Sequence, residues 1–367
     1  MPTDSGRRTL DPARFANLLV DYCLEVRSSE RIAVWASSLA APLILELQRA
    51  ILERGASPLL MIELPGQVRG FVAHAGDRQL DQPLPLERVT AQEMDRLLVL
   101  LAPCPEDSME GIAPERIARR AQARATHLGA LIAPVPLCGT MWPTPMLARE
   151  ADMSPSELSD FFARALMLDR PDPSAAWREL RDRQQRLVER LADARRVRIE
   201  ADGTDLELRV DGRTWINSDG RHNMPSGEVY TSPLETSAEG RIRFGGAARI
   251  DGERVAGVEL ELRGGEVVAS RADEGEAVVR RLLATDAGAR RVGELGIGTN
   301  FGIARTIGTA LFDEKVGGTV HLALGDGYVE AGGTNESAIH CDLVCDLRGG
   351  GRLTVDDEPL IESGALR

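Results

Sequence analysis

Continuous apolar runs alternate with segments of helical apolar spacing over the first half of the chain. Four runs rich in branched aliphatic residues are predicted strands: 31–36, 58–64, 96–102 and 128–134. Apolar residues recur every three or four positions in the predicted helices: 12–26, 40–54, 114–126, 154–168 and 175–192. Strands that are apolar throughout, separated by helices, are typical of a parallel sheet covered on both faces. The pattern predicts an N-terminal parallel α/β domain over residues 1–194.

The pattern changes after about residue 194. Short segments now alternate apolar with polar residues, and glycines separate them. The predicted strands are 197–201, 205–210, 241–244, 255–262 and 266–269. Alternation of this kind is typical of antiparallel strands with one buried face. We therefore predict a second, β-rich domain over residues 195–367, and an α/β fold class for the whole chain.

Two alternating segments near the end of the chain carry polar residues that suit a metal. His321 lies in 319–325, and His340 and Asp342 lie in 338–344. Side chains two apart on a strand share a face, so His340 and Asp342 point the same way. Imidazole nitrogen and carboxylate oxygen are ligands for Zn, Mn, Co or Fe. An ordinary buried His–Asp pair remains an alternative for this stretch.

Two glutamates upstream extend this candidate set. Glu228 follows a Pro/Gly turn and leads into a short strand, and Glu294 precedes a glycine-rich stretch predicted to be a loop. Together with the two histidines and the aspartate they make five ligands. That number suits two divalent ions that share one carboxylate and polarise a water molecule between them. In contrast, no glycine-rich phosphate loop follows any N-terminal strand, which argues against a nucleotide cofactor.

The order and spacing of these residues resemble one known family. The pattern is N-x-P-x-x-E-V-x-T-x-P, then G-E, then H-x-A-x-G-x-x-Y, then G-x-N-x-S-x-x-H-x-D. The matching residues are Asn223, Pro225, Glu228, Val229, Thr231 and Pro233, then Gly293 and Glu294, then His321, Ala323, Gly325 and Tyr328, then Gly333, Asn335, Ser337, His340 and Asp342. The second domain thus resembles the thermophilic-type metallo-aminopeptidases, the family of aminopeptidase T and aminopeptidase S.

The resemblance implies a function and a set of site residues. The implied activity is removal of N-terminal residues from peptides by a water molecule activated between two divalent ions, Zn, Co or Mn. The implied metal-site residues are Glu228, Glu294, His321, Tyr328, His340 and Asp342. Glu228 or Glu294 would act as the general base, and Tyr328 would stabilise the oxyanion. The family also implies a homodimer.

A second branch of the same superfamily is similar in other positions. The mononuclear iron 2,5-dihydroxypyridine dioxygenases share stretches matching 224–227, 231–233 and 237–240. In that branch the position of Glu228 is apolar and that of Glu294 is His, which leaves a two-His-one-Asp site for Fe(II). The ligand set of this chain favours the hydrolase. A non-catalytic metal-binding protein on the same scaffold is the third hypothesis.

The amino-acid composition indicates which classes of binding partner and which cellular compartment to expect. The formal net charge of −13 argues against nucleic-acid or anionic-membrane partners, which need clustered positive charge. The N-terminus lacks the apolar core of a signal peptide, and no run approaches the roughly 20 apolar residues of a membrane span. Five cysteines without framework spacing fit a reducing cytoplasm. We predict a cytoplasmic enzyme whose partner is a peptide or small-molecule substrate.

Overall fold

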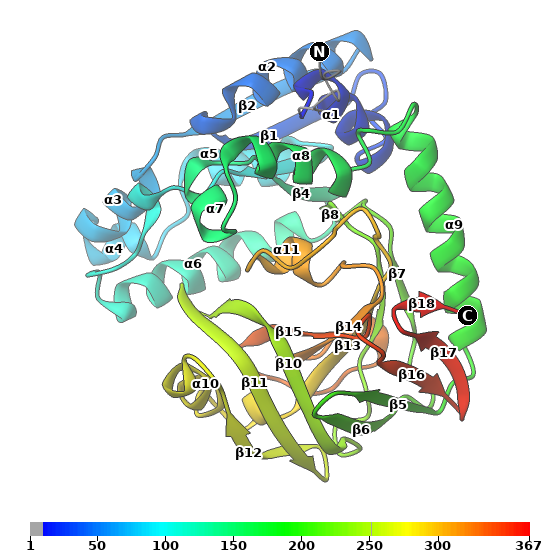
Figure 1. The fold of residues 1–367 in the computed structure, drawn as a ribbon. Coiled ribbons are helices and arrows are strands. Elements are labelled where there is room, and N and C mark those ends of the chain that lie inside the picture. The colour runs from blue at the N-terminus through cyan, green and yellow to red at the C-terminus, as the bar shows by residue number, and fades with distance from the viewer. Residues whose placement is uncertain (1–9, 251) are drawn as a thin grey trace, which may run out of the picture. The chain divides into compact units, whose positions relative to one another are not determined.

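The computed structural model describes residues 10–250 and 252–367, except for the side chains of 129–131. The chain divides into two compact units. Unit 1 comprises the described residues up to Ser174 together with Gly220–Met224, and unit 2 comprises Ala175–Asp219 and the described part of Pro225–Arg367. Each unit has its own sheets, and each is described by itself below (Figure 1).

Unit 1 is built on a parallel sheet of five strands. Their order is β2-β1-β3-β4-β8, and every neighbouring pair is parallel. The strands are β1 (Arg31–Ser37), β2 (Ser57–Glu63), β3 (Arg96–Leu101), β4 (Leu137–Met141) and β8 (Asn223–Met224). Consecutive residues Ile32, Ala33 and Val34 are all buried, as a strand covered on both faces requires. The predicted parallel α/β layer is therefore confirmed.

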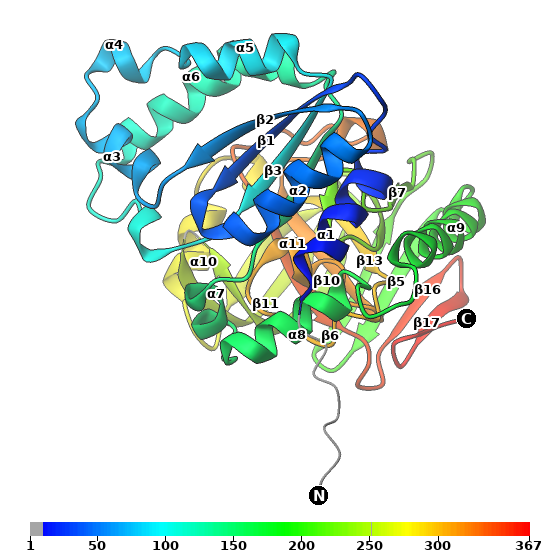
Figure 2. The same ribbon diagram turned by 90° about the horizontal axis from the view of Figure 1, so that it is seen from above.

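Helices cover both faces of this sheet (Figures 1 and 2). α1 and α2 pack together on one side, and α6 packs with α3, α4 and α5 on the other. The helices of unit 1 are α1 (Pro12–Leu18), α2 (Ala41–Glu53), α3 (Gln67–His74), α4 (Asp77–Leu80), α5 (Pro85–Glu93), α6 (Pro114–Ile132), α7 (Pro145–Glu150) and α8 (Pro155–Ala165). The predicted start of α1 is confirmed, because Asp11 Oδ1 accepts the Ala13 N–H at 2.9 Å as an N-cap.

The fourth strand lies later in the chain than predicted. Residues 128–132 continue helix α6, and the strand is Leu137–Met141. A short apolar run does not distinguish a buried strand from a helix by its pattern alone. Pro134 and Pro136 separate the two elements, because proline cannot continue a helix. The prediction of a strand at 128–134 was wrong for this reason.

Unit 2 is a pair of antiparallel sheets with a long helix. The larger sheet contains β12 (Glu266–Arg271), β11 (Glu253–Arg263), β10 (Glu239–Ile250), β6 (Thr204–Arg209), β5 (Arg196–Ala201), β16 (Arg352–Val355), β17 (Glu358–Glu362) and β18 (Ala365–Leu366), in that order. The smaller contains β15 (His340–Asp346), β14 (Thr319–Gly325), β13 (Val292–Gly298), β9 (Glu228–Thr231) and β7 (Ile216–Ser218). The helices are α9 (Pro173–Leu191), α10 (Glu276–Leu283) and α11 (Ala310–Asp313).

Helix α9 groups with unit 2, so the division falls near residue 174 instead of the expected 194. Leu187 and Leu191 of α9 are part of the hydrophobic core of unit 2. Gln184 of the same helix donates to the Ser218 carbonyl at 3.0 Å and also to the Glu228 carbonyl. The helix is thus fastened to β7 and β9 by side-chain contacts that its polar surface pattern does not reveal.

The core of unit 2 lies between its two sheets. The larger sheet contributes residues such as Ile199 and Ile242, and the smaller contributes Leu295 and Leu322. Because strand side chains alternate, every second residue of β13, β14 and β15 points away from this core. That outer face of the smaller sheet carries the candidate ligands. Within the described residues, no helix is long and apolar enough to cross a membrane.

Candidate metal centre

The register of three adjacent strands brings the predicted ligands together. Ala323 of β14 pairs with Glu294 of β13 on one side and with Asp342 of β15 on the other. Two carboxylates therefore flank the smallest chiral side chain, which leaves space between them. His340 pairs with Gly325, two residues along the same face. The sheet pairing thus creates a cluster that is spread over more than a hundred residues of sequence.

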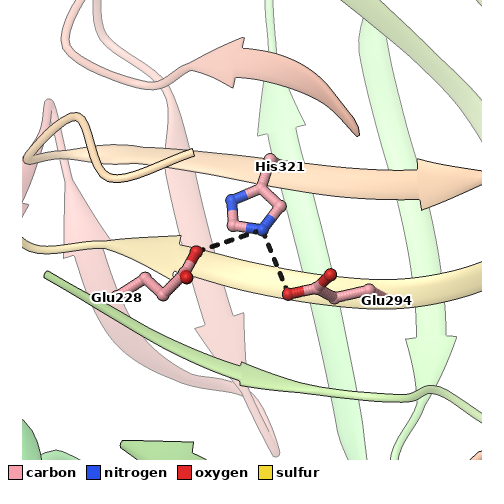
Figure 3. Close-up of side chains that lie close together, drawn as sticks. All are labelled: Glu228, Glu294 and His321. Carbon is pink, nitrogen blue, oxygen red and sulfur yellow. Dashed lines mark hydrogen bonds and ion pairs between the residues drawn. The ribbon is translucent and has the colours of Figure 1, made fainter. Parts of the chain in front are cut away.

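Glu228, Glu294 and His321 form the first ligand group (Figure 3). His321 Nε2 lies 3.4 Å from Glu228 Oε2 and 3.3 Å from Glu294 Oε1. All three side chains are buried. The His321 ring lies over Gly296, where an added Cβ would come within 2.0 Å of His321 Cε1. A glycine opposite His321 is therefore a steric requirement of this arrangement.

Glu294, His340 and Asp342 form the second group. His340 Nε2 lies 3.1 Å from Glu294 Oε2 and 3.6 Å from Asp342 Oδ1. The predicted common face of His340 and Asp342 is thus observed. Glu294 belongs to both groups and presents one oxygen to each histidine.

Two of the acidic oxygens have the character of metal ligands. Among the described residues, neither Glu228 Oε2 nor Asp342 Oδ1 has a hydrogen-bond partner, although both atoms are buried. Buried carboxylate oxygens without a donor are costly unless a cation neutralises them. These are also the two atoms that face the histidine Nε2 atoms. The residues present therefore fit divalent cations with mixed nitrogen and oxygen ligands.

His340 is oriented by a backbone contact. Its Nδ1 lies 2.9 Å from the Asp326 carbonyl oxygen, to which Nδ1–H can donate. A donor at Nδ1 leaves the Nε2 lone pair free for a cation, as is usual for metal-binding histidines. His321 Nδ1 has no partner in the part of the chain that the structure describes. The orientation of His321 depends instead on its packing over Gly296.

Close packing of these ionisable groups shifts their pKa values. Burial disfavours the charged imidazole, but Glu294 and Glu228 outweigh that effect and raise the pKa of His321 to about 9. In the same way burial opposes charge on His340, whereas Asp342 and Glu294 raise its pKa to about 11. Burial would raise the pKa values of Glu294 and Asp342, yet the two histidines hold both below their ordinary values. The cluster therefore favours ionised carboxylates and attracts positive charge.

The structure adds two charged residues that sequence reasoning missed. Lys315 is 1% exposed, and its Nζ lies 2.9 Å from Glu228 Oε1 and also contacts Glu314 Oε2. Burial disfavours the ammonium, but Glu228 and Glu314 outweigh it and raise the pKa of Lys315. Burial raises the pKa of Glu314, an effect that Lys315 opposes. The available sequence signal was the run of three charged residues, 313–315, between the apolar residues Phe312 and Val316.

Tyr328 lies beside the second group without joining it. Its ring centroid is 5.1 Å from that of His340 and 4.9 Å from that of Tyr230. Its backbone N–H donates to Ser232 Oγ at 2.9 Å, which holds the start of the segment after β14. Burial, with the charges of Glu294 and Asp342, raises the pKa of Tyr328, so the phenol is neutral. A neutral phenol beside the cluster is a candidate hydrogen-bond donor.

The glycine-rich stretch after Glu294 is a strand instead of the predicted loop. Residues 292–298 form β13, and all seven are buried. Glycine is needed there because strand β14 and its histidine approach closely. Thr299 and Asn300 follow this strand, and their contacts are structural: Thr299 N–H donates to the Gly227 carbonyl at 2.8 Å, and Asn300 Nδ2 donates to the Ser226 carbonyl at 3.0 Å.

The cysteines near the site belong to the opposite face. Cys345 is part of the core between the sheets, and Cys341 packs against that core. None of the five cysteines forms a disulfide in the structure, which describes all of them. A thiolate contribution to the metal centre is therefore not indicated, as the alternation of β15 predicts.

Comparison with known proteins agrees with this arrangement. Residues 10–364 match the family of thermophilic metalloproteases, M29. The chain is 28% identical to aminopeptidase 2 from Geobacillus stearothermophilus, with 96% of each chain covered. It is 27% identical to aminopeptidase T from Thermus aquaticus, covering 96% of this chain and 95% of that protein.

Solved structures show the same fold. The wild-type AmpT structure from Thermus thermophilus superposes with a TM-score of 0.82 at 25% identity, covering 97% of this chain and 98% of that one. A 2,5-dihydroxypyridine dioxygenase from Pseudomonas putida KT2440 has a TM-score of 0.57 at 15% identity, covering 97% and 96%. The second likeness concerns the fold alone. The match over nearly the whole chain, with its ligand cluster, shows that this protein belongs to the M29 metalloprotease family and is a metal-dependent peptidase.

Proposed function

We propose that the protein is an aminopeptidase that uses two divalent ions, Zn, Co or Mn. The observation that carries this proposal is the sharing of Glu294 between two ligand groups. Glu228, Glu294 and His321 would hold one ion, and Glu294, His340 and Asp342 the other. Bound there, the ions would supply Lewis acidity that polarises water and the scissile carbonyl.

The chain's own residues would provide binding, proton transfer and charge stabilisation. Glu228 or Glu294 accepts a proton from the attacking water, because both carboxylates are buried at the centre of the cluster. Tyr328, whose ring lies against His340, is the candidate donor to the developing oxyanion. One of the ions would also be available to bind the unprotonated nitrogen of the free α-amine of a peptide.

The relatives support the aminopeptidase specificity, since the matched proteins are named aminopeptidases. The dioxygenase alternative is less well supported. A dioxygenase of that branch is expected to have an apolar residue at position 228 and His at position 294. This chain has carboxylates at both positions, and both carboxylates lie in the cluster. A non-catalytic metal-binding role would leave the phenol and the buried base candidates without use.

Metal content and substrate requirement together test the proposal. Metal-free protein should take up about two divalent ions per chain in a calorimetric titration. The loaded protein should hydrolyse an aminoacyl amide with a free α-amine and leave its N-acetylated counterpart intact. Uptake of a single Fe(II) with oxygen-dependent cleavage of a dihydroxypyridine would establish the alternative, and metal uptake without any turnover would indicate a binding protein.

Glu294→His is the sharpest variant, because it separates the two enzyme classes at one position. A carboxylate offers two oxygens and a negative charge, whereas a neutral imidazole offers one nitrogen. The second ion should bind much more weakly, and peptide hydrolysis should collapse. The new imidazole with His340 and Asp342 would form a two-His-one-carboxylate face suited to Fe(II). Retention of two ions and of the peptidase rate would show that Glu294 does not bridge.

Compartment and assembly are further proposals. Five cysteines that form no disulfide in the described structure suit a reducing cytoplasm. A homodimer is proposed from the family resemblance, and sedimentation equilibrium of the metal-loaded protein tests it. The net charge of −13 supports a peptide or small-molecule partner over nucleic acid.

A further inference from the structure

A buried lysine contacts one of the proposed metal ligands. Lys315 follows the short helix α11 and is 1% exposed, and its Nζ lies 2.9 Å from Glu228 Oε1. Its backbone is fixed as well: the N–H donates to the Phe312 carbonyl at 3.1 Å, and the carbonyl accepts the Asn300 N–H at 3.0 Å. A fully buried ammonium is expensive to place and must be matched by negative charge.

The two oxygens of Glu228 have different surroundings. Oε1 accepts from Lys315, whereas Oε2 faces His321 Nε2 at 3.4 Å. The ammonium therefore occupies one oxygen and leaves the other for a metal. Lys315 also contacts Glu314, so one ammonium pairs with two carboxylates. None of the roles derived above for metal binding or proton transfer uses this lysine.

We propose that Lys315 is an internal counter-cation that holds Glu228 as a single-oxygen ligand and weakens the ion in the Glu228–Glu294–His321 group. The proposal rests on the two-ion function described above. It assigns the two ions different affinities: the ion held by Glu294, His340 and Asp342 binds more tightly, and the ion beside Lys315 exchanges more readily.

The position of the lysine gives the direction of the effect. Lys315 places a buried positive charge 2.9 Å from Glu228 Oε1, the carboxylate that would hold the first ion. A divalent ion on Glu228 Oε2 would share this carboxylate with the Lys315 ammonium, which contacts Oε1. Like charges a few ångströms apart repel strongly in a buried site. Removal of the lysine charge should therefore tighten this ion, while the metal-free fold should lose stability.

The test is a stepwise metal titration of Lys315→Met beside the wild type. Wild-type protein should show two binding steps for Zn²⁺ of different affinity. In Lys315→Met the weaker step should tighten by about tenfold or more, and the tighter step should change little. Glu228→Gln assigns the steps, because it should abolish the weaker one. Lys315→Gln keeps a hydrogen-bond donor without the charge and should shift affinity in the same direction, so it serves if the methionine variant does not fold.

Thermal unfolding provides a second readout. Addition of Zn²⁺ should raise the unfolding temperature of Lys315→Met by more than it raises that of the wild type, because the ion replaces the lost positive charge. The matched control is Arg120→Met in unit 1, which breaks another buried ion pair, Arg120 with Glu87 at 2.9 Å. That variant should lose stability with both metal affinities unchanged.

The outcomes separate this inference from the proposed function. If the wild type binds two ions but the weaker step is unchanged or weakened in both lysine variants, Lys315 does not act as a counter-cation. If the wild type binds one ion or none, the two-ion function itself fails. Tightening of the weaker step in both variants, with the control unaffected, supports the role of Lys315.

Discussion

Single residues of the cluster have separable roles because strand alternation assigns each to one face. His340 and Asp342 point to the ligand side of β15, whereas Cys341 packs toward the core between the sheets. Adjacent residues of β15 therefore contribute to different properties, one to metal binding and the next to core packing. Substituting each in turn separates the two contributions.

His340→Ala should lose metal binding, and Cys341→Ala should not. The histidine supplies a nitrogen ligand, and loss of a direct ligand should weaken the second ion by more than about 100-fold. The cysteine lies on the opposite face and packs against the core, so its replacement should cost about 1 kcal/mol of unfolding free energy. Calorimetric metal titration and urea unfolding of both variants measure the two effects. Equal metal affinity in His340→Ala and the wild type would show that His340 and Asp342 form an ordinary structural pair.

Asp313 predicts a pH dependence of stability that does not involve the ligands. Its carboxylate accepts the Ile307 and Gly308 N–H groups at 2.7 and 2.8 Å. Burial raises the pKa of Asp313 to about 7, although these N–H groups and the charge of Arg305 oppose the shift. The folded protein therefore binds this proton more tightly than the unfolded chain does.

The sign follows from linkage. Stability from a raised pKa is fully present below the unfolded value, near pH 4, and is lost as pH rises through about 7. The unfolding free energy of the wild type minus that of Asp313→Asn should therefore fall between pH 5 and pH 8. Urea unfolding at fixed metal concentration across this range measures the difference. A constant difference would mean that Asp313 stays ionised throughout.

At the scale of elements, the ligand set depends on how β13, β14 and β15 pair. Gly296 lies opposite His321, and Ala323 lies between Glu294 and Asp342. A slip of one residue would turn every ligand to the core face. Small residues at these positions are therefore part of the site, even though they carry no polar group.

Gly296→Ala should disturb the first ligand group. The added Cβ would lie 2.0 Å from His321 Cε1, so the ring or the strand must move. Overpacking of this kind costs on the order of 1–3 kcal/mol, and the ion bound by His321 should weaken. Gly245→Ala in β10 is the control, since an added Cβ there meets no atom within 4 Å. Unfolding and metal titration are the measurements, and identical behaviour of the two variants would contradict the steric argument.

At the scale of the whole molecule, the chain consists of two compact units, and the five candidate ligands all lie in unit 2. A ligand that binds only the folded form stabilises the region that it contacts. Metal binding should therefore affect the two units unequally. The parallel sheet of unit 1 supplies none of the ligand groups found among the described residues.

Hydrogen exchange should reveal this inequality. Addition of Zn²⁺ to metal-free protein should slow amide exchange in β9, β13, β14 and β15 and leave β1 and β3 nearly unchanged. Mass spectrometry of peptides from both units measures the effect, and chelator-treated protein with added Mg²⁺ controls for ionic strength. Equal protection of both units would show that metal binding stabilises the whole chain and not mainly the sheet that carries the ligands.

The fold class, the family and the candidate ligands could all be predicted from the order of amino acids. Apolar runs such as 31–36 predict buried strands because burial on both faces leaves no polar position. Alternation placed His340 and Asp342 on one face, because the side-chain period of a strand does not depend on its neighbours. The ordered motifs from Asn223 to Asp342 identified the family.

Features that depend on contacts between distant segments became visible only in the folded chain. Apolar residues at 128–132 fit a strand or a helix, and helix α6 extends through them up to the break at Pro134. The glycines of β13 resembled a loop, because a strand needs such small residues only when a neighbour like His321 crosses closely. Lys315 is part of no sequence motif, because its partner Glu228 is 87 residues earlier in the chain. The two side chains come within 2.9 Å of each other only in the folded structure.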